Sequence, residues 1–214
     1  MITMKEHSAA HRIFTAVITC MFAFFSLNCW STKPSHFYSL TPVKGTTGDF
    51  KNDPLPHVAI GIRTLKLPEY LLRDQLVTRT ATDEILLSEH NRWAEPLEEN
   101  FRRVLIEDLS KDIPTNNVFL LPAKDSSVTN YQILLEVTEF ELQKNNTIAL
   151  SARWSITKGE AIAFLMDKQS SFTEQISDER AERFESIVAG MSRLTGKLSG
   201  EIAAEIRRIA SPVK

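Results

Sequence analysis

Residues 131–157 read YQILLEVTEFELQKNNTIALSARWSIT, and this stretch decides the fold. Residues 131–142 and 147–157 predict two long strands, joined across Asn145-Asn146, a pair that tolerates positive φ in a tight hairpin. In the second strand apolar residues alternate with polar ones, so one face is predicted to be buried and the other to face water. The apolar positions are Leu150, Ala152, Trp154 and Ile156.

Shorter strands are expected on both sides of this hairpin along the chain. Residues 76–80 and 84–88 flank Ala81-Thr82-Asp83 as a second hairpin, and Lys158-Gly159 turns the chain into a third long strand. The further strands expected are residues 58–62, 76–80, 84–88, 117–121 and 161–172.

Two helices are predicted. The first begins at residues 95–97, because Pro is tolerated in the first turn of a helix, and it ends before Pro114. The second begins with Ser177 as its N-cap and runs to about residue 210. Three glycines in this long helix lower its helix propensity, which indicates either close backbone packing or a break. They are Gly190, Gly196 and Gly200.

These elements predict an α+β domain, in which an antiparallel or mixed sheet of about six strands packs with two helices, the C-terminal one long. The 214 residues leave room for one sizeable domain, and 43% hydrophobic with 24% charged residues is a globular composition. We expect the domain at residues 57–214. The preceding residues 29–56 are rich in Pro and Gly and predict an extended tether with one short ordered piece at residues 37–40.

Residues 1–28 are predicted to be an export signal. Lys5 and Arg12 precede an uncharged apolar run of about fifteen residues, which is shorter than the roughly 20 that a spanning helix needs. An uncleaved membrane anchor is the alternative. Cys29 follows Leu27 and Asn28 at the end of this run, where a lipoprotein signal places its acylated residue. Cys29 is therefore the candidate lipidation site.

The other cysteine, Cys20, lies inside the apolar run and is interpreted as an ordinary residue of the signal. Because no cysteine follows Cys29, neither a disulfide framework nor a Cys-based metal site is expected in the fold. Two or more acyl chains on one cysteine suffice for stable anchoring. Trp30 stands where an inner-membrane retention signal would place Asp, which favours the outer membrane.

Composition and motifs point away from nucleic acid and from catalysis. The net charge is -2 and Lys and Arg are not clustered, so the chain offers no broad positive field to a phosphate backbone. His36, His57 and His90 are scattered without ligand spacing, so we predict neither a metal site nor a cofactor. The sequence has no nucleophile elbow, no phosphate-binding Gly-rich loop and no dinucleotide fingerprint. We therefore predict a non-enzymatic protein and assign no catalytic residue.

Two places in the sequence are candidates for partner binding. Residues 65–72 read LKLPEYLL and follow a strand; they predict either a core-crossing loop or a contact surface, in which Leu67 and Tyr70 would be contact residues. Trp93 precedes the first helix. It is interpreted either as a staple that packs the start of the helix onto the sheet or as a partner-binding aromatic residue.

Several short motifs follow one another in a definite order after the lipoprotein signal. They are Phe37-Tyr38-Ser39-Leu40, eight residues after Cys29, then Leu67-Pro68-Glu69-Tyr70-Leu71, Trp93-Ala94-Glu95-Pro96-Leu97, Val137-Thr138-Glu139-Phe140, Arg153-Trp154, and residues 187–192 and 198–202. In this order they resemble the ABC-type transport auxiliary lipoprotein family. The resemblance covers nearly all of the chain after Cys29.

The resemblance implies a lipoprotein of the bacterial outer membrane that faces the periplasm. Its implied partners are a membrane-anchored mammalian-cell-entry-type protein with its permease/ATPase, which together move lipids between the inner and outer membranes. The chain itself would dock or seal, alone or as a homo-oligomer, and the nucleotide chemistry would belong to another subunit, because this sequence has no P-loop.

Two hypotheses from other classes stay open at the level of sequence. The first is a monomeric periplasmic carrier that binds one lipid in a cavity between the sheet and the long C-terminal helix. The second is a periplasmic hydrolase, which would need a convergent Ser/His/Asp site that the sequence does not show.

Overall fold

The computed structural model describes residues 33–43, 58–80, 84–113, 115, 117–122, 129–159, 163–176 and 183–210. Ser35–Lys214 forms one compact unit, separate from Met1–Pro34. The predicted export signal, Cys20, Cys29 and the predicted helix N-cap Ser177 lie outside the described residues.

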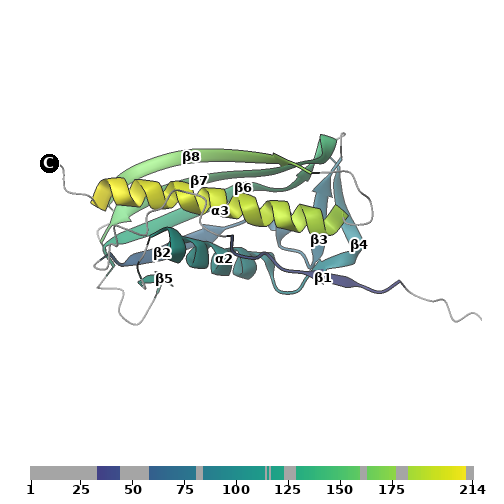
Figure 1. Ribbon diagram of the computed structural model, residues 1–214, viewed down its shortest axis with the longest axis horizontal. Coiled ribbons are helices and arrows are strands. Elements are labelled where there is room, and N and C mark those ends of the chain that lie inside the picture. The colour runs from purple at the N-terminus through teal and green to yellow at the C-terminus, as the bar shows by residue number, and fades with distance from the viewer. Residues whose placement is uncertain are drawn as a thin grey trace, which may run out of the picture. The chain divides into compact units, whose positions relative to one another are not determined.

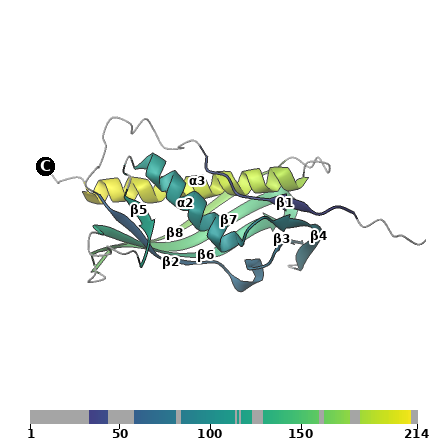
Figure 2. The ribbon, with the colours of Figure 1, turned by 90° about the horizontal axis from the view of Figure 1, so that it is seen from below.

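The compact unit has the α+β architecture that the sequence predicts, with both helices on one face of a mixed sheet (Figures 1 and 2). Eight strands are present among the described residues, because two three-residue strands join the longer ones. In chain order the elements are β1 (His36–Tyr38), β2 (Ile60–Lys66), β3 (Gln75–Arg79), β4 (Ile85–Trp93), α2 (Leu97–Asp112), β5 (Val118–Leu120), β6 (Tyr131–Gln143), β7 (Thr147–Lys158), β8 (Ala163–Gln175) and α3 (Arg183–Ala210), with 3-10 turns η2 (Glu69–Leu71) and η4 (Lys144–Asn146).

β6 is the central strand of the sheet. One of its edges pairs with β7 along its whole length in an antiparallel register, and β7 pairs in turn with β8. The other edge is shared: β2 lies parallel to the first half of β6, and β3 meets its end at the pair Thr78 and Leu142. β4 and β1 continue the sheet beyond β3, and β5 continues it beyond β2. Asn145 and Asn146 both have positive φ in the β6–β7 turn, which confirms the predicted hairpin.

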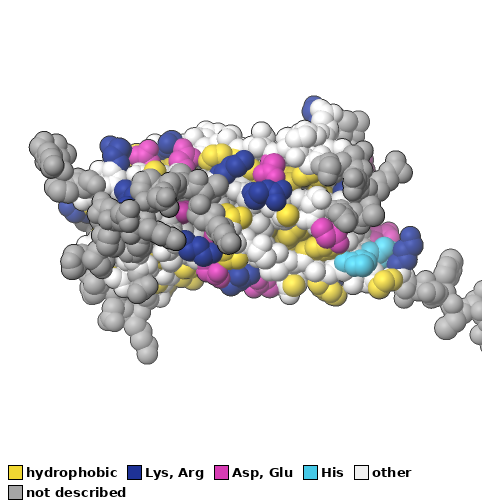
Figure 3. Space-filling model, viewed as in Figure 1, with side chains coloured by type: hydrophobic (Ala, Val, Ile, Leu, Met, Phe, Trp, Pro, Cys, Tyr) yellow, Lys and Arg dark blue, Asp and Glu magenta, His cyan; other side chains and the backbone are white. Residues whose placement is uncertain are grey.

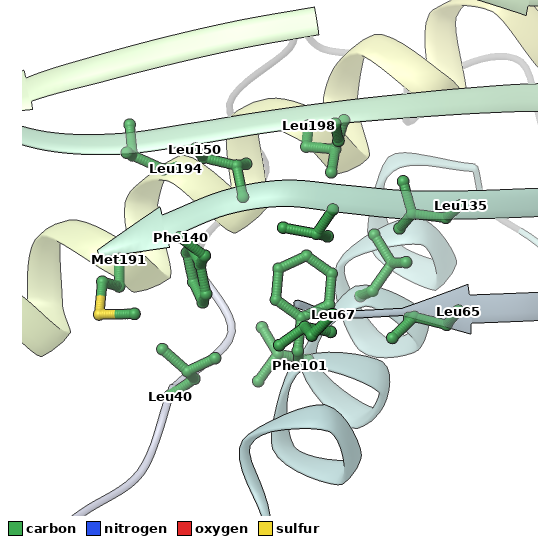
Figure 4. Close-up of a cluster of buried hydrophobic side chains, with 14 of the residues drawn as sticks. Leu40, Leu65, Leu67, Phe101, Leu135, Phe140, Leu150, Met191, Leu194 and Leu198 are labelled. Carbon is green, nitrogen blue, oxygen red and sulfur yellow. The ribbon is translucent and has the colours of Figure 1, made fainter. Parts of the chain in front are cut away.

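The core lies between the inner face of the sheet and the two helices. Phe140 of β6 meets Phe101 of α2 edge to face, with ring centroids 5.2 Å apart. Leu150 of β7 and Leu194 and Leu198 of α3 are fully buried in the same cluster (Figure 4). Full burial of each such side chain stabilises the fold by about 1.5–3 kcal/mol, so this layer supplies much of the free energy of folding.

The short ordered piece expected at residues 37–40 is confirmed as β1 and the fully buried Leu40 that follows it. The backbone N–H of Leu40 donates to Oδ1 of Asn100 on α2 at 2.6 Å, and the N–H of Thr41 donates to Oγ of Ser192 on α3 at 3.1 Å. This segment is therefore held by both helices as well as by β4, with which β1 pairs in parallel.

α3 is continuous from Arg183 to Ala210, so of the two interpretations of its glycines, close packing holds at Gly190. A Cβ atom on Gly190 would collide with the side chain of Ile148 on β7. α3 can therefore approach the sheet closely at this point because Gly190 has no side chain. No helix within the described residues is both long and apolar enough to cross a membrane.

Gly190→Ala is expected to lower the free energy of unfolding by about 1–3 kcal/mol, because overpacking at Ile148 outweighs the roughly 1 kcal/mol gain in helix propensity. The Cδ1 methyl of Ile148 is the atom in the way, so Ile148→Val in the same chain should relieve the collision. Urea unfolding of the two single variants and the double variant measures this coupling. Strictly additive losses would contradict the proposed contact.

Candidate docking site

The candidate docking segment, residues 65–72, leaves β2 and reaches β3 through η2 (Glu69–Leu71). Leu67 and Leu71 are buried, whereas Leu72 is 47% exposed. Both interpretations of this segment therefore apply to different side chains, since one side of it packs in the core and the other faces outward.

The structure separates the three residues that the sequence proposes for partner binding. Leu67 is buried and points into the hydrophobic cluster beside Phe101 (Figure 4). Trp93 is buried as well, and its backbone N–H donates to the carbonyl of Asp74 at 2.7 Å. These positions favour packing roles for both side chains. Tyr70 is only partly buried and lies at the surface of the segment, so it is the one of the three placed for direct contact.

Tyr70 is held in place by a buried carboxylate. Glu141 lies on β6 between the core residues Phe140 and Leu142, so its side chain points to the opposite face of the sheet, where it is fully buried. Tyr70 Oη donates to Glu141 Oε2 at 2.8 Å, and the Phe140 N–H donates to the same oxygen at 2.9 Å. Nε and Nη2 of Arg79 each lie 2.9 Å from Oε1. Both carboxylate oxygens are therefore satisfied.

The electrostatics of this cluster keep Tyr70 and Arg79 each in one charge state. Burial, then the hydrogen bond and negative charge of Glu141, raise the pKa of the Tyr70 phenol well above its ordinary value. Burial alone would lower the pKa of Arg79, but its hydrogen bond and charge interaction with Glu141 outweigh burial and raise it. Tyr70 therefore stays a neutral donor and Arg79 a cation, with its guanidinium carbon 5.6 Å from the centre of the Tyr70 ring.

A second buried polar cluster joins the end of α2 to α3. Ser199 donates to Oδ2 of Asp112 at 3.2 Å, and Nη2 of Arg207 donates to the carbonyl oxygen of Asp112 at 3.0 Å. One turn earlier on α2, burial raises the pKa of Asp108 to about 6, with the charge of Asp112 adding to the rise and Lys111 opposing it. This cluster fixes the crossing of the two helices and lies away from the docking segment.

The outer face of the sheet, away from the helices, carries a hollow of about 310 Å³. Charges of alternating sign cross it from strand to strand, since Lys66 lies opposite Glu136 and Glu136 opposite Arg153. Its lining residues are Thr64, Lys66, Leu134, Leu135, Glu136, Arg153, Trp154, Ser155 and Asp167. Within the described part of the chain, no group of three or more His, Cys, Asp or Glu is arranged to hold a metal ion.

Residues 38–203 match the family model described as the ABC-type transport auxiliary lipoprotein component. The chain belongs to this family. The match begins at the last residue of β1 and ends inside α3, so β2 to β8, α2, most of α3, the docking segment and Glu141 lie inside the shared domain.

Two curated relatives and one solved structure are similar to this chain at low sequence identity. The intermembrane transport lipoprotein PqiC of Escherichia coli K12 is 24% identical over 149 residues, which cover 69% of this chain and 74% of the relative; PqiC of Shigella flexneri gives the same values. A crystal structure of a Xanthomonas campestris protein superposes with a TM-score of 0.68 at 10% identity, covering 82% of this chain and 99% of that one. This likeness shows the fold.

The sequence analysis did not single out Glu141 or Arg79. Glu141 alternates with apolar neighbours, as a solvent-facing residue of a half-buried strand would, so the local pattern predicted exposure. Its burial results from η2, a turn some 70 residues earlier in the chain, which covers this part of the outer face.

Arg79→Ala is expected to lower the free energy of unfolding by about 3 kcal/mol, because it leaves the fully buried Glu141 carboxylate without a counter-charge. Arg208→Ala, which removes an exposed ion pair with Glu205, is the matched control and should cost less than about 1 kcal/mol. Urea unfolding at neutral pH compares the two. Equal losses would show that Arg79 does not neutralise a buried charge.

Proposed function

We propose that this protein is an envelope lipoprotein that serves as a non-enzymatic accessory subunit of a mammalian-cell-entry-type transporter. In this proposal it is acylated at Cys29, anchored in the outer membrane and faced toward the periplasm, and its transporter moves lipids between the inner and outer membranes. The family match over residues 38–203 carries the proposal, and the similarity to PqiC, an intermembrane transport lipoprotein, supports transport between two membranes.

The anchor and the fold are close neighbours along the chain. Residues 30–35 alone separate Cys29 from the first residue of β1, and seven residue steps span at most about 25 Å when fully extended. The proposed tether therefore ends effectively at β1, because Leu40 and Thr41 are already bonded to the helices. A lipid on Cys29 would hold the folded unit near the membrane surface.

The partner in this proposal is the membrane-anchored mammalian-cell-entry-type protein with its permease/ATPase, and this chain docks to it as one copy or as a homo-oligomer. Tyr70 and the exposed Leu72 are the proposed contact residues of the docking segment. The Glu141–Arg79 pair fixes Tyr70 before binding, which reduces the conformational entropy lost in the complex.

The carrier hypothesis needs open space between the sheet and α3. In the described structure, that space is filled by fully buried side chains such as Leu150, Leu194 and Leu198 (Figure 4). The hollow on the other face is crossed by charged side chains, which do not suit an acyl chain. This packing favours the accessory role, and lipid that co-purifies at a fixed stoichiometry would favour the carrier instead.

Metabolic labelling with a palmitate analogue tests the anchor. We expect wild type and Cys20→Ala to be labelled and to fractionate with the outer membrane, whereas Cys29→Ala should lose both the label and the location, because the acylated sulfur is gone. Gel fluorescence and membrane fractionation give the two readouts. If the wild type is not labelled, the lipid anchor is wrong, and the protein is instead either soluble or held in the membrane by an uncleaved signal.

Leu72→Ser is expected to weaken association with the mammalian-cell-entry-type partner about tenfold, which corresponds to about 1.4 kcal/mol, while changing stability little because the side chain is half exposed. Leu120→Ser is the matched control, since Leu120 is 40% exposed and lies on β5. Affinity capture with the full-length lipoprotein, together with urea unfolding, separates docking from folding. If Leu72→Ser captures the partner as well as the wild type does, this segment is not the contact.

Leu67→Ala and Trp93→Ala should instead lower the free energy of unfolding by about 2–5 kcal/mol, because both side chains are buried.

A further inference from the structure

Three exposed apolar side chains lie along the β1–β4 edge of the sheet, at which the chain enters the fold, with Phe37 about 17 Å along β4 from Leu87. Phe37 on β1 is 65% exposed, and Leu86 and Leu87 on β4 are 45% and 48% exposed. β1 pairs with β4, and Phe37 lies opposite Arg92. Figure 3 shows apolar side chains beside the histidines at this end of the surface. None of the three side chains is explained by the core, by the docking segment or by the proposed acylation.

Leu86 and Leu87 are neighbours in a strand, so they point to opposite faces of the β3–β4 hairpin. The register agrees, because Leu86 pairs with Thr78 and Leu87 with Val77. A flat protein surface laid against one face would cover only one of the two leucines. A fluid lipid surface that closes around the strand covers both.

Charged residues limit how deep such a contact can go. Glu84 and Glu89 are exposed on either side of the leucine pair, and Arg92 is partly exposed beside Phe37. Carboxylates are costly in hydrocarbon but tolerated among head groups, where aromatic rings are also favoured. The contact therefore fits the head-group layer of a bilayer and not its hydrocarbon centre.

The length of chain before β1 limits how far this end of the fold can lie from the membrane. Phe37 follows Cys29 by eight residues, which span at most about 28 Å. A head-group layer is itself about 5–8 Å thick, so at most about 20 Å of this length extends beyond it once the acyl chains are inserted. This step rests on the proposed acylation of Cys29.

The opposite end of the fold lies too far away to share the contact. Tyr38 packs on Phe184 at the start of α3, with ring centroids 6.3 Å apart. On β8, Lys168 pairs with Glu201 at 2.6 Å, which is 17 residues or about 26 Å further along the helix. Phe164 lies four residues before Lys168 on β8 and is 65% exposed, as Phe37 is.

We propose that Phe37, Leu86 and Leu87 form a lipid-contact surface that seats the β1–β4 end of the fold on the phospholipid head groups around the Cys29 anchor. The surface binds a phospholipid layer, and it directs the other end of α3 away from the membrane.

The test uses full-length, acylated protein in vesicles of phosphatidylethanolamine and phosphatidylglycerol. Phe37→Cys, Leu87→Cys and Phe164→Cys are each labelled with an environment-sensitive fluorophore; the acylated thiol of Cys29 does not react. Lipids with a nitroxide on the head group are then added. We expect a blue-shifted emission and about twofold quenching at positions 37 and 87, with neither at position 164, since only head-group contact brings the nitroxide close.

Each outcome bears on a different step. Protein that does not float with the vesicles lacks the anchor, which overturns the proposed function and this surface together. If the protein floats but position 37 gives the same emission and quenching as position 164, the lipid-contact surface is overturned and the anchor is left intact. A blue shift without nitroxide quenching means that protein, such as a second copy, covers the patch, and this also overturns the lipid contact.

Discussion

The pairing of β6 is the constraint on which the rest of the structure depends. Its edge toward β7 is fully used over twelve registered pairs, so every other strand on that side of the sheet must attach to the remaining edge. β2 and β3 share that edge in tandem, and the chain between them runs beside it, where Tyr70 reaches Glu141 on the outer face of β6. This connection is the docking segment. Its position above Glu141 thus follows from the strand order, and the segment presents Leu72 outward because Leu67 and Leu71 are already turned toward the core.

The burial of the Glu141 carboxylate beneath the docking segment is energetically costly. Desolvation of Glu141 costs several kcal/mol, and only the combination of Arg79, Tyr70 and the Phe140 N–H offsets it. An apolar residue at position 141 could fill the same space, so stability alone does not explain the charge. What the carboxylate adds is direction: it accepts the Tyr70 hydroxyl at a defined point, and thereby fixes η2 against β6. That rigidity agrees with the proposed role of the segment, in which it meets a partner in one orientation.

The sequence predicts the elements whose pattern is periodic over many residues. The two strands of residues 131–157 and the long helix were recognisable because each buries one face, and the positive-φ turn because Asn145-Asn146 stands between them. Contacts between distant segments were not recognisable. Glu141 reads as a solvent-facing residue until η2 covers it, and Leu67 and Trp93 read as possible contacts until the sheet shows that both fill the core. Leu86-Leu87 carried no signal at all, since two adjacent leucines look like ordinary core residues until both are found exposed.

The place where the chain enters the sheet also limits what the protein can do between two membranes. β1 is held between β4 and the helices, so under the proposed acylation the reach from Cys29 to the fold is at most about 25 Å. The 28 residues of α3 add about 42 Å. α3 begins beside β1, where Tyr38 packs on Phe184, so under the proposed acylation no part of α3 can lie more than about 85 Å from Cys29, and any wider gap has to be bridged by another protein. A short reach and a fixed orientation agree with the proposed accessory role, in which the protein receives the end of a longer partner and does not span the distance itself.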